Sequence, residues 1–247
     1  MTAVLALTER VVRSGYRDLD LVFAVIAPAV TFVGATVALR GVIDTGGMSY
    51  PQYVLPAIVV QAMLFGALNT TDRAAAEHSS EFGVRLRTLP ISVYAPLQAR
   101  LLYCALRGVL ALVATFSVAY LFGFRFDGGA GYAVAFVVMS LTLTIALSLG
   151  ADATGARAKR EDTSSQLLLI PQLLLVLLST GLAPAESFPD WLQPFVRYQP
   201  VSQITDTLRG FTDGVVGSAN LTVSVSWCLV LVVTLGVLAM RTQQRTR

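Results

Sequence analysis

The sequence predicts an all-α integral membrane protein with six transmembrane helices, and two observations support this fold class. Of the 247 residues, 55% are hydrophobic and only 13% are charged, against about 25% charged in a typical soluble domain. The apolar residues also gather into long runs of the ~17 to 25 residues that a helix needs to cross a bilayer. The expected spans are about 19–39, 53–71, 101–122, 131–150, 167–183 and 221–240. The fifth run is the shortest and contains Pro171.

Residues 1–18 predict an amphipathic helix that lies on the inner leaflet. Leu7 and Val11 share one side at helical spacing, while three arginines occupy another. Such a helix buries its apolar face in lipid and holds its arginines at anionic headgroups. A frayed cytoplasmic tail is the alternative. A cleaved signal peptide is not expected, because the run 19–39 is longer than the 7–15 apolar residues of a signal core.

Basic residues predict the orientation of the spans, since they are enriched in cytoplasmic loops. If six spans alternate from a cytoplasmic N-terminus, thirteen basic residues lie on the cytoplasmic side: Arg10, Arg13, Arg17, Arg73, Arg85, Arg87, Arg100, Arg157, Lys159, Arg160, Arg241, Arg245 and Arg247. Four lie on the outer side: Arg40, Arg125, Arg197 and Arg209. Both termini are therefore expected in the cytoplasm. The net charge of +3 follows from this topology and does not require a nucleic-acid partner.

The longest predicted inner loop, from Asp72 to Arg100, contains the stretch "EFGVRLRTLPIS". In a helix its apolar residues align at i, i+4 and i+7: Phe82, Leu86 and Leu89. Glu81 and Arg85 form an acid-before-base i,i+4 pair, and Pro90 ends the helix. A short helix with an apolar row and a charged flank suits the groove of a partner protein. A solvated basic loop, kept only as an orientation signal, is the alternative.

The segment 184–214 is the second informative connection. Four prolines exclude one continuous helix: Pro184, Pro189, Pro194 and Pro200. Two sets of apolar side chains still share faces at helical spacing: Trp191, Phe195 and Tyr198, then Ile204, Leu208 and Phe211. This pattern predicts two short helices split around Pro200 that dip into the outer leaflet, where aromatic rings are favoured. An ordinary surface loop is the alternative.

Several kinds of chemistry are missing from the chain. His78 is the one histidine, and Cys104 and Cys228 lie in different predicted spans, so neither a metal site nor a structural disulfide is expected. The one lysine, Lys159, does not stand in a phosphate-binding G-x-x-x-x-G-K-[ST] loop. No acid falls in the middle of a predicted span, which disfavours an ion-coupled transporter. Any energy for transport must therefore come from outside the chain.

Arg107 is the one charged residue inside a predicted span. It lies about six residues, or roughly 9 Å, from the cytoplasmic end of that span. Two interpretations are open. The side chain can snorkel to the inner interface, or it can face the bundle interior and contact an anionic substrate or a neighbouring carbonyl.

The inner stretch "EFGVRLRTLPIS" and the outer stretch "FPDWLQPFVRYQPVSQITDTLRGFTDG" together resemble the permeases of the ABC-2 transporter family, most closely those of daunorubicin-resistance-type and mycobacterial lipid exporters. The likeness covers essentially the whole chain as one transmembrane domain. One departure is Val84, since many relatives have threonine after the glycine.

The resemblance implies a permease subunit of an ATP-driven exporter that moves an amphiphilic drug, lipid or glycolipid outward across the plasma membrane. Two such subunits, identical or sister chains, would each dock on a separate ATPase, which would bind ATP and magnesium; this chain would need no cofactor. The expected ATPase-coupling residues are Glu81, Phe82, Gly83, Arg85, Leu86, Arg87, Leu89 and Pro90. The expected substrate-path or outer-gate residues are Arg107, Trp191, Phe195 and Tyr198. An integral membrane enzyme or an ion-coupled secondary transporter is the alternative.

Overall fold

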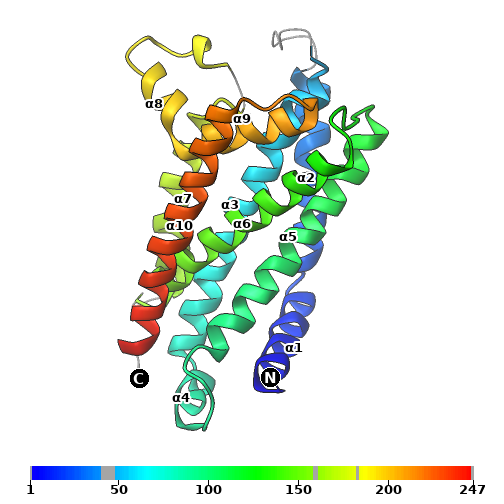
Figure 1. Cartoon of the computed structure of the whole chain (residues 1–247). Coiled ribbons are helices and arrows are strands. Elements are labelled where there is room, and N and C mark those ends of the chain that lie inside the picture. The colour runs from blue at the N-terminus through cyan, green and yellow to red at the C-terminus, as the bar shows by residue number, and fades with distance from the viewer. Residues whose placement is uncertain (1, 40–47, 158–160, 182–183, 246–247) are drawn as a thin grey trace.

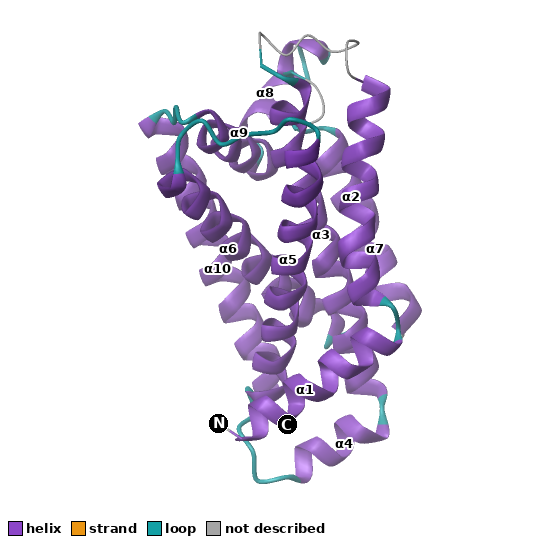
Figure 2. Ribbon diagram, turned by 90° about the vertical axis from the view of Figure 1, so that its right-hand side faces the viewer, coloured by secondary structure: helices purple, strands orange, loops and turns teal. Residues whose placement is uncertain are grey.

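The protein is a bundle of long helices that run between two ends (Figures 1 and 2), known here from a computed structural model that describes residues 2–39, 48–157, 161–181 and 184–245. The elements in chain order are α1 (Thr2–Arg17), α2 (Asp20–Leu39), α3 (Tyr50–Ser79), α4 (Glu81–Thr88), α5 (Ala95–Leu121), α6 (Ala130–Gly155), α7 (Glu161–Leu177), a 3₁₀ turn η1 (Ala185–Ser187), α8 (Gln193–Tyr198), α9 (Pro200–Asp213) and α10 (Ser218–Arg245). The described residues contain no strand, so the all-helical prediction is confirmed.

Within the described residues, five helices are long and apolar enough to cross a membrane: α2, α3, α5, α6 and α10. The sixth predicted span corresponds to α7, whose apolar part covers only Leu168–Leu177. Its first turns are polar, beginning "EDTSSQ", and Pro171 lies inside the helix. The membrane fold is confirmed by five spans, and the sixth remains a prediction.

The two ends of the bundle differ in what they carry. The α4 end, at the bottom of Figure 1, holds α4, α1 and the last turns of α10. The α8 end, at the top, holds α8 and α9. Helix α3 lies at the centre and packs against α2, α5, α6, α7 and α9. Its window of span residues is 78% buried, against 17% for α10, so α3 is the core helix and α10 turns most of its surface outward.

The first helix meets the first span at a sharp elbow. Leu19 takes a positive φ of 59°, a left-handed conformation that L-residues rarely adopt and that interrupts helical geometry. Gly15 allows α1 to cross α5 closely, because a Cβ there would lie 2.1 Å from the hydroxyl of Tyr103. The predicted N-terminal helix is therefore present, and it packs on α5 instead of lying free.

Two predicted connections have a different structure. The inner loop from Asp72 to Arg100 is mostly helical, because α3 continues to Ser79 and α5 begins at Ala95. In the segment 184–214, α8 and α9 are split around Pro200 as predicted. The apolar stripe of α9 packs against protein, however, where the sequence predicted contact with lipid. This stripe joins the main core cluster of the bundle: Ile204, Leu208 and Phe211.

Candidate functional site

Helix α4 protrudes at its end of the bundle (Figure 2) and is rooted on the last turn of α3. Ser80 is its N-cap: the hydroxyl accepts from the backbone N–H of Gly83 at 3.2 Å and donates to the carbonyl of Glu77 at 2.9 Å. A serine cap of this kind satisfies a free helical N–H. A Cβ on Gly83 would lie 1.9 Å from the Glu77 carbonyl oxygen. Glycine is therefore required where α4 leaves α3.

The predicted coupling residues do not form one exposed row. Phe82 lies under the guanidinium of Arg10, whose Cζ is 3.3 Å from the ring centroid. Leu86 is 7% exposed, so the chain itself covers this side chain. Leu89 is 49% exposed and follows the helix as its C-cap residue.

The charged flank of α4 is free to meet a partner. Glu81 and Arg85 are exposed, and their charged groups lie 4.0 Å apart as the i,i+4 pair that the sequence predicts. Pro90 follows the helix and is exposed. The side chain of Arg87 lies outside the described part of the structure. Among the side chains that the structure describes here, the surface of α4 is thus mainly charged, and Leu89 adds an exposed apolar side chain at its C-cap.

A buried ionic network, which we call the base network, lies where α3 approaches α4. It consists of Glu77, Arg100, Asp152 and Gln243. Arg100 Nε donates to Asp152 Oδ1 at 2.5 Å, and Gln243 Nε2 donates to Asp152 Oδ2 at 2.9 Å. Arg100 Nη1 lies 2.8 Å from Glu77 Oε1. The network joins α3, α5, α6 and α10 at a single point.

A second network, the elbow network, ties the α1–α2 elbow to α3 and α5. Asp20 accepts from Asn69 at 2.8 Å and from Arg107 Nε at 3.2 Å, and the Tyr103 hydroxyl also donates to it. Arg73 lies 3.6 Å from the same carboxylate. Arg107 is 8% exposed. Its partner in the structure is therefore Asp20, which neither sequence interpretation of Arg107 named.

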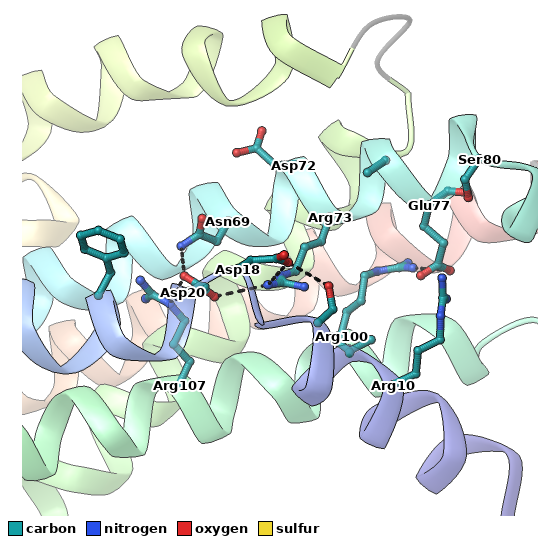
Figure 3. A pocket seen from close by; sticks show the side chains of 14 residues that line it. Arg10, Asp18, Asp20, Asn69, Asp72, Arg73, Glu77, Ser80, Arg100 and Arg107 are labelled. Carbon is teal, nitrogen blue, oxygen red and sulfur yellow. Dashed lines mark hydrogen bonds and ion pairs between the residues drawn. The ribbon is translucent and has the colours of Figure 1, made fainter. Parts of the chain in front are cut away.

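A cavity of about 1020 Å³ lies between the two networks, and we call it the vestibule. Figure 3 shows Asp20 and Arg107 toward one end, and Glu77, Arg10 and Arg100 toward the other. Its charged lining residues are four arginines and four acids: Arg10, Arg73, Arg100, Arg107, Asp18, Asp20, Asp72 and Glu77.

The aromatic face predicted for the outer segment is exposed at the α8 end. Trp191, Phe195 and Tyr198 are 79%, 49% and 73% exposed. Val196, on the opposite side of α8, is fully buried, and Arg197 is held by Glu186 at 2.8 Å. This arrangement turns the aromatic rings away from the protein, as a leaflet anchor requires.

Next to α8, Arg209 of α9 organises a partly buried polar cluster. Its guanidinium stands 4.0 Å from the ring centroid of Tyr53, and its Nη1 donates to Asp206 Oδ1 at 2.8 Å. The Thr180 hydroxyl also donates to Asp206, at 2.9 Å. Burial raises the pKa of Asp206 above its ordinary value, although Arg209 acts in the opposite direction. The cluster fastens α9 to α3.

Within the described ranges, no group of three or more histidine, cysteine or acidic side chains could hold a metal ion. Both cysteines are buried and unpaired. The two networks, the vestibule and the exposed surfaces of α4 and α8 offer ion pairing, hydrogen bonding and apolar contact. These are interactions that bind a ligand or a partner protein.

Sequence reasoning missed both networks. The pairs join residues far apart in the chain, such as Arg100 with Asp152 and Arg107 with Asp20. From the sequence alone, Arg73 and Arg100 indicate only the orientation of the spans. One signal was available, because Asp20 and Arg107 each lie at or inside an apolar run and an isolated charge there needs a partner.

Comparison with known proteins identifies relatives along most of the chain. The family described as "ABC-2 family transporter protein" matches residues 31–241. A doxorubicin resistance ABC transporter permease protein, DrrB, of Mycobacterium tuberculosis is 33% identical over 176 residues, which cover 71% of this chain and 60% of the relative. A daunorubicin resistance ABC transporter permease protein, DrrB1, of Streptomyces coeruleorubidus is 30% identical over 80% of this chain and 70% of the relative.

A third relative is a probable doxorubicin resistance ABC transporter permease protein, DrrC, of Mycobacterium tuberculosis. It is 26% identical over 213 residues, which cover 84% of this chain and 75% of the relative. The match to DrrB spans less than two thirds of that protein's length. The resemblance seen in the inner and outer stretches is thereby confirmed.

Proposed function

Because the chain belongs to the ABC-2 family of transporter proteins, we propose that it is the permease subunit of an exporter driven by a separate ATPase. The observation that carries this proposal is α4. It is a short, capped helix that protrudes from one end of the bundle and offers exposed charges, and it is rooted on the core helix α3. A permease without its own phosphate-binding loop needs a docking element of this kind, through which a separate ATPase can transmit its conformational change.

The contacts at the root of α4 suggest how a push would travel. Gly83 lies against the Glu77 carbonyl, so a displacement of α4 along this contact acts directly on the end of α3. The base network then links Glu77 through Arg100 to Asp152 and Gln243. Buried ion pairs hold their geometry strongly, because a separated charge is left without compensation. In this mechanism α5, α6 and α10 move together with α3.

The arrangement of the ends supports the proposed topology. The start of α1, the end of α10 and α4 lie at one end of the bundle, and α8 lies at the other (Figure 1). Helix α7 follows α6 at the α4 end and precedes α8, so it serves as the sixth crossing in our proposal. Both termini and α4 would then face the cytoplasm of a cell bounded by the plasma membrane, in agreement with the distribution of basic residues.

The proposed substrate is an amphiphile that leaves toward the outer leaflet. The three relatives carry resistance to doxorubicin or daunorubicin in their names, and lipids or glycolipids are the other members of the class. The exposed aromatic face of α8, formed by Trp191, Phe195 and Tyr198, would anchor this end of the permease where the substrate leaves. Pairing with a second copy or with a sister permease completes the proposed exporter.

Co-purification tests the proposed function. The chain, tagged and expressed in its native host, is extracted in mild detergent, and bound proteins are identified by mass spectrometry. We expect one stoichiometric nucleotide-binding ATPase and ATP hydrolysis in the purified complex. Export of an amphiphile by the chain alone, driven by a proton gradient without any ATPase, would contradict the proposal and favour a secondary transporter.

A further inference from the structure

A second cavity with the opposite chemistry adjoins the vestibule. We call this second cavity the slot; it has a volume of about 90 Å³ and lies between α2 and α3. Its wall is mostly apolar and includes Ala24, Ala27, Ile58 and Phe65. Phe23 and Arg107 line both the vestibule and the slot, so the two cavities meet at these side chains. A charged chamber and an apolar recess therefore lie in series.

The vestibule holds a buried donor that lacks an acceptor. Arg100 is 2% exposed, and its Nη2 has no hydrogen-bond partner among the described residues. Its Nη1 lies 2.8 Å from Glu77 Oε1 as an ion pair, but without the alignment of a hydrogen bond. A buried donor without an acceptor is costly. A ligand that brings an acceptor into the vestibule would remove this cost.

A second arginine faces the same end of the vestibule. Arg10 projects from α1 toward Glu77, and Arg100 approaches Glu77 from α5 (Figure 3). Arg10 stacks on Phe82 but forms no ion pair within the described part of the chain. Two guanidinium groups that are not fully used and approach one point favour an anion with several oxygens, and phosphate accepts from arginine in this way.

The acids of the vestibule are already engaged. Asp20 accepts from the residues of the elbow network, and Asp18 accepts from Ser14 at 2.9 Å. Glu77 is paired with Arg100, and Asp72 also has a partner. Each acid therefore has a donor or cation beside it, whereas Nη2 of Arg100 has no acceptor among the described residues. This balance favours an anionic headgroup over an amine, even though arginines and acids are equal in number.

The slot borders the exposed surface of α2. Phe23, at the junction of the two cavities, is 59% exposed, and Ala27, which also lines the slot, is exposed. Helix α2 is one of the five helices long and apolar enough to cross a membrane, so this surface suits contact with acyl chains. An apolar group could therefore enter the slot from the bilayer while its headgroup stays in the vestibule.

We propose that the vestibule and the slot together form one binding site for a phosphate-bearing amphiphile drawn from the bilayer. Arg10 and Arg100 bind the phosphate at one end of the vestibule, and the apolar chain extends to the opposite end, where the slot receives its far part. This inference deepens the proposed function and rests on it only in treating the occupant as cargo. Binding itself requires neither ATP nor the ATPase.

The test measures equilibrium binding to the full-length chain in maltoside detergent. The probe is radiolabelled lysophosphatidic acid with a 12-carbon chain. The competitors are the matching monoacylglycerol without phosphate, dodecylamine, and inorganic phosphate. We expect saturable binding at about one molecule per chain, displaced by unlabelled probe and by none of the three competitors at the same concentration. Equal displacement by dodecylamine or by inorganic phosphate would overturn the proposal.

Matched variants locate the site. Arg10→Gln should weaken binding of the probe about tenfold or more, as loss of a hydrogen bond to a charged group predicts. Arg13→Gln is the control, because Arg13 is exposed on the same helix and does not line the vestibule. Ala27→Leu, which fills the slot, should also weaken binding about tenfold, whereas Ala38→Leu, on the exposed surface of α2 beyond the slot, should not.

Arg100→Lys provides a further test, because it keeps the charge and removes Nη2, together with the Nε–H that donates to Asp152. It should weaken probe binding while the protein remains monodisperse on gel filtration. Unchanged binding in both Arg10→Gln and Arg100→Lys would overturn the site. Because the ATPase can be scored in parallel by co-purification, loss of the inference and loss of the proposed function are separate results: absence of binding in a chain that still captures its ATPase refutes only the binding site.

Discussion

Two short connecting helices, α4 at one end of the bundle and α9 at the other, have similar sequence patterns but differ in burial. Each carries apolar residues at helical spacing beside polar ones. Helix α9 is packed on α3, α6 and α10, and its apolar stripe belongs to the main core. Helix α4 packs chiefly on the end of α3 and leaves its charged flank exposed. The same local pattern thus gives a buried core helix at α9 and a protruding, partly exposed helix at α4. The difference lies in how many neighbouring helices each one packs against.

The largest expected effect comes from a variant that disrupts the base network next to α4. Asp152→Ala leaves the Arg100 guanidinium buried without its closest carboxylate, and removal of one partner from a buried pair costs about 3–5 kcal/mol. We expect a loss of about 4 kcal/mol in unfolding free energy, measured by denaturant titration in detergent. Arg85→Ala on α4 is the control, because its exposed pair with Glu81 contributes under about 1 kcal/mol. Equal losses would show that the base network is not structural.

A second change tests the claim that α9 belongs to the core. Phe211 is 5% exposed and Phe195 on α8 is 49% exposed. Phe211→Ala should cost about 3 kcal/mol of stability through loss of packing, and Phe195→Ala should cost under about 1 kcal/mol. Thermal unfolding of the two variants, monitored by circular dichroism, compares them directly. A reversed order would place α9 outside the core.

A third change separates α4 from α3 without altering any charge. Gly83→Ala puts a Cβ against the Glu77 carbonyl, and relief of such overpacking costs about 1–3 kcal/mol. We expect α4 to shift, with faster proteolysis between Ser80 and Ala95. The control is Gly34→Ala in α2, where a Cβ meets nothing within 4 Å and the helix gains up to about 1 kcal/mol. Unchanged proteolysis in Gly83→Ala would contradict the close contact.

The smallest expected effect concerns the pH dependence of the α9 anchor. Burial raises the pKa of Asp206 in the folded protein. A carboxyl with a raised folded pKa stabilises the protein most below its unfolded pKa, and this contribution is lost as pH rises through the folded value. Unfolding free energy measured from pH 4 upward should therefore fall more steeply in the wild type than in Asp206→Asn. Identical slopes would show that Asp206 does not titrate with folding; Asp190→Asn, at an exposed residue, is the control.

The sequence predicted what depends on neighbours along the chain. Long apolar runs located five spans, and Pro90 marked the end of α4, whose helix ends at Thr88. The ionic networks were beyond this kind of reasoning. Gln243 and Asp152 are 91 residues apart, and no local pattern marks them as partners.

The burial of α9 was unpredictable for a different reason. A stripe such as Ile204, Leu208 and Phe211 has the same spacing whether it faces lipid or protein, so periodicity gives the face of the helix and not the environment. The apolar residues of α4 show the same limit of periodicity, because Leu86 is covered by the chain itself while Leu89 is exposed beyond the helix. Tertiary contacts decided both cases.

The most direct test of the account compares the two ends as surfaces for the ATPase. The double variant Arg85→Glu with Leu89→Ser changes exposed groups of the α4 region, and Arg197→Glu with Tyr198→Ser makes the matched change on α8, where both residues are also exposed. Affinity for the purified ATPase is measured with each permease in nanodiscs. We predict that the α4 variant binds at least about thirtyfold more weakly, corresponding to a loss of about 2 kcal/mol, while the α8 variant binds like the wild type. Unchanged affinity in the α4 variant, or an equal loss in both, would contradict the coupling role of α4.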